Sequence, residues 1–444
     1  MKPCALALLL VAADPAWERE LSDPGDIRRV FLAGDVVVVQ LRSRVDTFDL
    51  ATGKPLASIS LAIVGTPPGA MATPEFAAGT VLVQVSIYDL KTGRAVATDA
   101  IEGAGRVSGT AFYSWSGDKL VKTAGAGHPE WSLLLKDIAR SPILPSCDSG
   151  AVLRVPAPKG GTESAKSYVS VSPAGKIEWS VPIPEADQAG MEQIRNWAIP
   201  AEGKDLYLLC GKIKGSDHAL WTAIIDGKAK RIVIKDVTSP HPKMSPQSQV
   251  MHIVRRDNAW HAVANGEVDV EVEEAGKKRK VKAPGLVVVN LSEGKEVRRV
   301  AAGLNLEAPP GYAVWKDNEV FDAIANKSLG KLGTPAAQVW FTKSFALVKE
   351  GPKMSWVALA GGEVKTAEFQ GSLGRTLGDV VAAQGRDGQK TVVGYFDMEK
   401  GTFEKVKSYD GGVQSWIEAV TDGWVLVGVN AGRTRELVAA KRSK

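Results

Sequence analysis

The chain has 444 residues, of which 44% are hydrophobic and 24% charged, and this ordinary globular composition excludes an intrinsically disordered protein. Its net charge of +5 is spread along the whole length, without the focused basic face that nucleic-acid-binding proteins carry. No stretch beyond the N-terminus is long and apolar enough to span a bilayer. We therefore expect no nucleic-acid partner and no transmembrane segment.

The N-terminus has the parts of a secretory signal peptide. Lys2 supplies a positive charge, residues 5–11 are apolar, and the small residues Ala12 and Ala13 end the run. A buried first strand is the alternative for the same run. We predict a signal peptide over residues 1–13, a periplasmic or secreted protein, and one domain over residues 14–444.

The three cysteines leave the redox chemistry open. Cys4 precedes the apolar run, whereas a lipid-attachment cysteine would follow it, so we expect no lipid anchor. Cleavage of the signal peptide would leave Cys147 and Cys210, which could pair in an oxidising compartment or remain two buried thiols.

Short β-branched runs bounded by turn residues recur along the chain and predict an all-β fold. These runs are residues 36–41, 80–85, 205–209, 286–289 and 424–429. Helical periodicity is nearly absent, and the best helical candidate is the segment 186–197.

A turn with Asp or Asn at one position and Gly four residues later recurs between these runs. Its four strongest copies are Asp49 with Gly53, Asp89 with Gly93, Asn290 with Gly294, and Asp397 with Gly401. The Asp or Asn side chain accepts backbone N–H groups further along the turn, and the Gly adopts a left-handed conformation. We interpret these eight residues as structural turn positions in hairpins.

The spacing of the turns predicts a β-propeller with four-stranded antiparallel blades. Asp49 and Asp89 are 40 residues apart, which suits four short strands, and Asp397 lies 348 residues after Asp49. We predict eight blades, with seven as the alternative. Pairing of residues 16–20 with residues 436–439 would leave no open edge strand.

The sequence Asp-Leu-Ala-Thr-Gly-Lys at 49–54, with the strand-like run before it, resembles the PQQ-like repeats of quinoprotein-dehydrogenase propellers, as does the copy at 175–179. WD40-like repeats share the same architecture. For an enzyme the resemblance implies a stacking aromatic, a calcium ion held by carboxylate and amide oxygens, an Asp base and often a disulfide between adjacent cysteines. No adjacent cysteines occur here, and many proteins with such repeats resemble scaffolds. We expect a non-enzymatic member without a cofactor.

Catalytic and metal-binding motifs do not appear. There is no His-Glu-x-x-His, Cys-x-x-Cys, phosphate loop or nucleophile elbow. The five histidines lack metal spacing, although His252 and His261 could face one another across a hairpin. The many Trp residues are expected between blades, or in part at the rim as an apolar binding surface. We assign no catalytic residue and no metal ligand.

The most distinctive segment is a charged hairpin within residues 266–283. Acidic residues alternate with Val on its first limb, and the returning limb is basic. With the turn at Ala275-Gly276, each acidic residue meets a lysine; the expected pairs are Asp269 with Lys282, Glu271 with Lys280, and Glu273 with Lys278. Val270 then meets Val281 on the other face. The hairpin is either a plain projection from a blade or a docking arm for a partner protein.

We therefore expect a secreted or periplasmic propeller, monomeric, that acts as a binding or scaffold module for a protein or another cell-envelope ligand. The rival interpretation is an enzyme, either quinone-dependent or based on carboxylates in the central channel. A convergent cluster of Asp, Glu, His or Arg would favour the enzyme.

Overall fold

The computed structural model describes residues 11–12, 15–21, 24–63, 71–77, 79–98, 106–108, 110–145, 150–156, 165–182, 191–195, 206–213, 219–226, 231–238, 251–274, 277–290, 293, 295–300, 302–303, 308–309, 311–315, 318–334, 337–432 and 434–442. These residues form β-strands and two single-turn 3₁₀ helices, Pro24–Asp26 and Lys136–Ile138, and none of them lies in an α-helix. The all-β prediction is confirmed.

The chain divides into two compact units, residues 1–56 with 301–444, and residues 57–300. Each unit is described by itself, and the boundary at Leu56 falls within β6. The sheets of the first unit are, in the order of neighbouring strands, β3 (Ile27–Ala33), β4 (Val36–Leu41), β5 (Arg44–Asp49) and β6 (Pro55–Ser60); β27 (Ala302–Gly303), β28 (Tyr312–Trp315), β29 (Glu319–Asp322) and β30 (Lys327–Lys331); β31 (Val339–Phe341), β32 (Phe345–Glu350), β33 (Lys353–Ala358) and β34 (Lys365–Glu368); β35 (Gly371–Leu377), β36 (Val380–Asp387), β37 (Lys390–Asp397) and β38 (Thr402–Asp410), with β1 (Val11–Ala12) parallel to β38; and β39 (Gln414–Val420), β40 (Trp424–Ala431), β41 (Thr434–Lys441) and β2 (Trp17–Leu21).

The second unit repeats the same pattern. Its sheets are β7 (Glu75–Ala77), β8 (Thr80–Val83), β9 (Ser86–Asp89) and β10 (Ala95–Ala97); β11 (Arg106–Ser108), β12 (Ala111–Ser116), β13 (Lys119–Ala124) and β14 (Pro129–Leu134); β15 (Ile143–Pro145), β16 (Ala151–Pro156), β17 (Ala165–Val171) and β18 (Ile177–Pro182); β19 (Met191–Arg195), β20 (Leu206–Ile213), β21 (Ala219–Asp226) and β22 (Arg231–Thr238); and β23 (Met251–Arg256), β24 (Ala259–Glu274), β25 (Lys277–Asn290) and β26 (Lys295–Val300).

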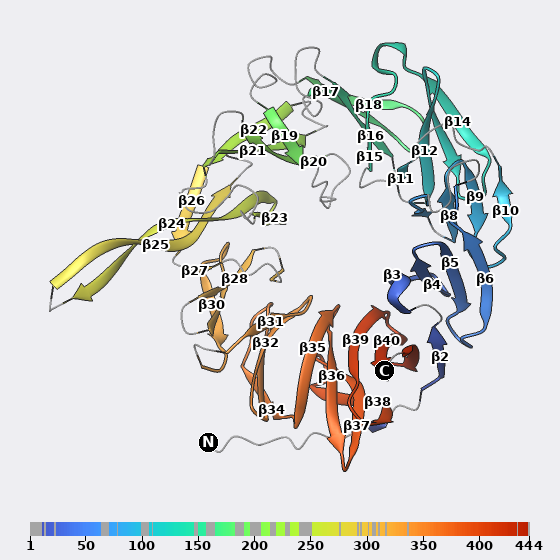
Figure 1. The fold of residues 1–444 in the computed structure, drawn as a ribbon. Coiled ribbons are helices and arrows are strands. Elements are labelled where there is room, and N and C mark those ends of the chain that lie inside the picture. Colours follow the sequence, from blue (N-terminus) through green and yellow to red (C-terminus); the bar gives the residue numbers. More distant parts are fainter. Residues whose placement is uncertain are drawn as a thin grey trace. The chain divides into compact units, whose positions relative to one another are not determined.

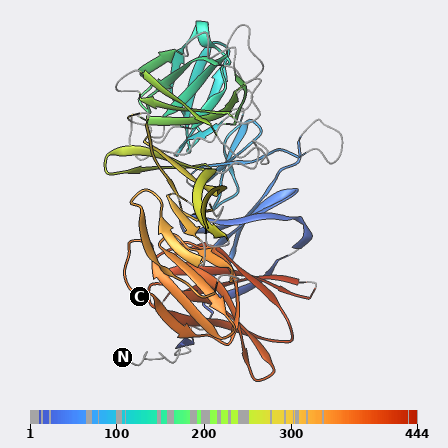
Figure 2. The same cartoon turned by 90° about the vertical axis from the view of Figure 1, so that its left-hand side faces the viewer.

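Repeated four-stranded antiparallel meanders make this a fold of β-propeller type (Figure 1). The described strands form ten sheets, nine of four strands and one to which β1 adds a fifth, and they can be followed by colour in Figure 2. The expected number of eight blades, or seven, is therefore not confirmed. The segment 186–197, the best helical candidate of the sequence, contains strand β19 at Met191–Arg195 instead.

Central strands bury both of their faces, and this explains their continuous apolar runs. In β36, Val380 and Ala382 pack toward β39–β41, whereas Val381 and Ala383 pack toward β31–β34. Each hydrophobic cluster of the described residues thus lies between two neighbouring sheets rather than within one.

The predicted pairing of the two chain ends is confirmed. Strand β2 completes the last sheet by pairing with β41, with Trp17 opposite Ala439 and Leu21 opposite Arg435. Lys407 of β38 binds both Glu18 of β2 (2.5 Å) and Glu436 of β41 (3.0 Å). An N-terminal strand therefore covers what would be the open edge of β41.

The turns make the hydrogen bonds that their sequence suggests. Asp49 Oδ1 accepts the backbone N–H and the hydroxyl of Thr52, at 2.8 and 2.6 Å. Asp89 bonds in the same way to Thr92, at 2.7 and 2.9 Å. Asn290 Oδ1 accepts the N–H of Glu293 (3.1 Å), whereas Gly294 lies outside the described residues.

One further copy of this turn has no Gly. Asp322 Oδ1 accepts the N–H groups of Ile324 and Ala325, and Asn326, four residues after Asp322, takes the left-handed conformation with a φ of 56°. The Asp–Gly pattern does not include this turn because Asn, which tolerates the left-handed conformation, stands at the Gly position.

Two of the turn glycines also lie directly against tryptophans of the neighbouring sheet. A Cβ on Gly53 would lie 2.6 Å from the ring of Trp17, and one on Gly175 would lie 2.8 Å from the ring of Trp131. The indole N–H of Trp17 donates to the Leu50 carbonyl at 2.6 Å. These Trp residues therefore pack between sheets, and the Gly is needed for its lack of a side chain as well as for its φ.

We expect Gly53→Ala to destabilise the protein more than Gly34→Ala. Both glycines have a positive φ, 67° and 65°, but a Cβ on Gly34 would meet nothing within 4 Å. The left-handed backbone should cost about 1–2 kcal/mol in each variant. The clash with Trp17 should add about 1–3 kcal/mol to the loss for Gly53 alone.

Urea unfolding of both variants measures this difference. The excess for Gly53→Ala should vanish in a Trp17→Ala background, where the ring is absent. Equal losses in the two single variants would show that the ring does not require this glycine.

Candidate functional site

The charged hairpin extends well beyond its sheet. Strand β23 pairs with β24 only as far as Ala264, and β26 pairs with β25 only from Leu286 onward. Between these limits, eight consecutive residue pairs, from Glu267 opposite Pro284 to Glu274 opposite Lys277, join β24 to β25 alone. We call residues 267–284 the arm, and Figure 1 shows it leaving the sheet as a two-stranded ribbon.

The register of the arm agrees with the one expected from its charges. Asp269 lies opposite Lys282, Glu271 opposite Lys280 and Glu273 opposite Lys278, and Val270 lies opposite Val281. A shift of one residue would place valines opposite lysines on one face and would break the acid–lysine pairs of the other, so the alternation determines the register.

One face of the arm is charged and exposed. Lys282 Nζ lies 2.8 Å from Asp269 Oδ1, and their side chains are 61% and 55% exposed. The Lys282 ammonium, helped by Lys280 and Arg299, holds the pKa of the Asp269 carboxyl below its usual range. Glu271 and Lys280 are exposed as well. Such exposed ion pairs contribute little to stability.

The opposite face is apolar toward the base of the arm, whereas near the tip the exposed Arg279 lies on it, opposite Val272. Val270, Val281 and Ala283 are half-buried, and Val268 is 4% exposed. Val268 is covered at the base of the arm, where a Cβ on Gly285 would lie 2.4 Å from its Cγ1 atom. No local pattern indicates this contact, because Gly285 follows a proline within a basic strand and resembles an ordinary turn residue.

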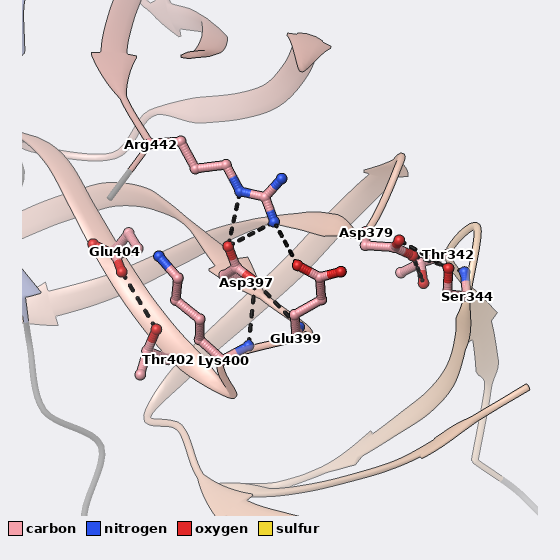
Figure 3. Close-up of polar contacts among 9 residues, drawn as sticks. All are labelled: Thr342, Ser344, Asp379, Asp397, Glu399, Lys400, Thr402, Glu404 and Arg442. Atoms are coloured by element: carbon pink, nitrogen blue, oxygen red, sulfur yellow. Dashed lines mark hydrogen bonds and ion pairs between the residues drawn. The ribbon is translucent and has the colours of Figure 1, made fainter. Parts of the chain in front are cut away.

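Two carboxylates of the first unit, the buried Asp397 and the half-buried Asp379, are engaged in structural bonds. Figure 3 shows Asp397, which is fully buried and whose Oδ2 accepts Arg442 Nε at 2.9 Å. Its Oδ1 accepts the N–H groups of Glu399 (3.1 Å) and Lys400 (3.3 Å). Asp397 therefore stabilises its own turn and also binds Arg442, the residue that follows the last strand.

Asp379 joins two sheets in a similar way (Figure 3). Its carboxylate accepts the hydroxyls of Thr342 (3.0 Å) and Ser344 (2.9 Å) and the N–H of Ser344 (2.7 Å). Sequence reasoning missed both carboxylates as joints because their partners come from neighbouring sheets. Neither arrangement has the free, convergent groups that would favour an enzyme.

The histidines do not converge. Val263 lies opposite His252 and Val254 opposite His261, so the idea that the two histidines face one another across the hairpin is wrong. Burial lowers the pKa of His261, and the charges of Arg256 and Arg298 lower it further. Among the described residues, no group of three or more His, Cys, Asp or Glu is placed to hold a metal ion.

Comparisons with known proteins find only distant similarities, all to solved structures. No protein-family model and no curated protein sequence matches the chain. Among solved structures, a eukaryotic initiation factor matches 79% of this chain and 89% of its own, at 10% identity and a TM-score of 0.44. The WD40 domain of SCAP from fission yeast matches 96% and 97%, at 8% identity and a TM-score of 0.34. A europium-containing methanol dehydrogenase matches 73% of each chain, at 13% identity and a TM-score of 0.28. Similarities this low carry no argument about function.

We expect Asp269→Lys to loosen the arm without affecting the rest of the fold. The variant would place a cation opposite Lys282, and like charges directly opposite one another disfavour pairing. Amide hydrogen exchange within residues 267–284 should accelerate about twofold to fivefold, since exposed pairs are weak.

The charge-swapped double variant Asp269→Lys/Lys282→Asp is the matched control and should restore protection. The melting temperature should stay the same in all three proteins, because the arm lies outside the packed sheets. Unchanged exchange in the single variant would mean that this pair does not stabilise the arm.

Proposed function

We propose that the chain is a binding or scaffold module that engages a partner protein through the arm, and that it acts as a monomer in the periplasm or outside the cell. The observation that carries this proposal is the arm itself. Eight residue pairs extend beyond the sheet, no other described strand pairs with either edge along them, and one face carries the half-buried Val270, Val281 and Ala283. Such a ribbon adds little to the stability of the fold, so its length points to a role outside the fold.

The first unit has the packed sheets of the propeller type, a fold that many proteins use to bind ligands. Its strands pack sheet against sheet, and its described polar clusters serve as joints. The likeness of the turns to PQQ-like repeats is retained as a proposal about ancestry. It concerns turn geometry, so it assigns no cofactor. No helix in the described part of the chain is long and apolar enough to cross a membrane.

Site-specific photo-crosslinking in cells tests the role of the arm. A photoreactive residue at Lys280, exposed on the arm, should give a defined crosslinked product with another protein. The same residue at Lys119, exposed on β13, is the matched control and should not.

Replacing residues 267–284 by a two-residue Asn-Gly turn between Gly266 and Gly285 should leave the melting temperature unchanged, because the paired ladder resumes there. Protein–protein crosslinks from other surfaces to the same partner should disappear. Identical products from Lys280 and Lys119, or partner recovery that survives removal of the arm, would contradict the proposed function.

We also expect the mature protein to begin at Asp14. Removal of residues 1–13 would take away β1, a two-residue strand, and leave β2 and its pairing with β41 intact. The intact mass of the protein from a periplasmic or culture-medium fraction measures this processing. A mass that includes residues 1–13 would contradict secretion by this signal.

A further inference from the structure

One edge of β25, the basic strand of the arm, has no partner strand among the described residues, and we call the space beside this edge the lane. Strand β26 pairs with β25 from Asn290 to Leu286, and no described strand pairs with residues 277–284 on that side. Two residues separate the paired Glu274 and Lys277, so the backbone N–H groups of Lys278, Lys280 and Lys282 are directed to the open lane. An extended segment entering there would continue the position of β26.

The lane is strongly cationic. Lys277, Lys278, Lys280 and Lys282 are exposed, and Arg299, at the end of β26 nearest the arm, is exposed too. The acidic residues of β24 are paired in register with these lysines at the other edge of β25. A strand added to the open lane would therefore stabilise the complex best with Asp or Glu at alternate positions, directly opposite the lysines.

The alternation also specifies the other face of the added segment. Val281 and Ala283 lie on the apolar face of the arm and are half-buried. Residues opposite them in an added strand would extend that apolar face, so the segment should alternate acidic with apolar residues. The strand β24, Glu-Val-Asp-Val-Glu-Val-Glu-Glu at 267–274, has this pattern and already pairs with the other edge of β25.

We propose that the arm captures an acidic extended segment of a partner protein as an antiparallel strand beside β25. This inference rests on the proposed function and names the chemistry of the partner. Main-chain hydrogen bonds provide affinity, and the alternation of acidic and apolar residues provides specificity. A second copy of this chain is a poorer occupant, because joining β24 of one arm to β25 of another is a head-to-tail contact that leaves two edges open.

A labelled peptide with the sequence of residues 267–274 is the probe, and fluorescence anisotropy with the full chain measures binding. We expect saturable binding that weakens as salt rises, because the lysines are exposed. A peptide with Lys in place of every acidic residue should not bind. Lys280→Gln should weaken binding about twofold to fivefold, since one exposed pair is lost.

Lys280→Pro separates strand addition from simple charge attraction. It removes the same charge as Lys280→Gln and also one N–H group facing the lane, so we expect at least about tenfold weaker binding than for Lys280→Gln. Val281→Pro is unsuitable as a control because its N–H faces β24. Hydrogen exchange of residues 267–274 should show that the arm remains paired in Lys280→Pro.

Equal binding to the Pro and Gln variants, equal binding of the Lys-substituted peptide, or no binding up to about 1 mM peptide would overturn strand capture. Arm-dependent self-association in sedimentation experiments would also overturn it, in favour of a second copy. The proposed function is tested separately. Crosslinks from Lys280 without peptide binding would refute only this inference, whereas the absence of those crosslinks would refute the docking role itself.

Discussion

The pairing of β2 with β41 is the constraint on which the architecture of the first unit depends. A sheet of three strands from the end of the chain is completed by five residues from its beginning. Trp17 then packs against Gly53 of the next sheet, and Glu18 meets Lys407 of the preceding one. One short strand thus joins three sheets, and without it the edge of β41 would offer unpaired backbone groups to other chains.

The other contacts that stabilise the first unit also connect neighbouring sheets. Central strands bury both faces, so each sheet is stabilised by the two beside it rather than by a core of its own. Polar groups that reach these contacts need partners, and Asp397 obtains Arg442 while Asp379 obtains Thr342 and Ser344. These two carboxylates therefore have structural roles at the contacts between sheets.

The arm differs from the rest because it extends beyond the packed sheets. The charges of the arm determine its register, and Gly285 leaves room for Val268 at its base. Its two edges pair with nothing else among the described residues. Because exposed ion pairs stabilise little, the length of the ribbon is not explained by the stability of the fold. Strand β25 continues beyond the end of β26 and carries lysines there. This edge is better suited to receiving another strand than to supporting the propeller.

The sequence by itself determined the features that depend on near neighbours in the chain. These are the Asp–Gly turns, the register of the arm and the all-β class, because alternation and turn chemistry act over a few residues. It also indicated the β2–β41 pair, since two complementary strands remained unpaired at the ends. Only the tertiary structure decided that Trp17 needs Gly53, that Arg442 binds Asp397 and that ten sheets form among the described residues. Those contacts join residues of separate sheets, and no local pattern specifies which sheets become neighbours.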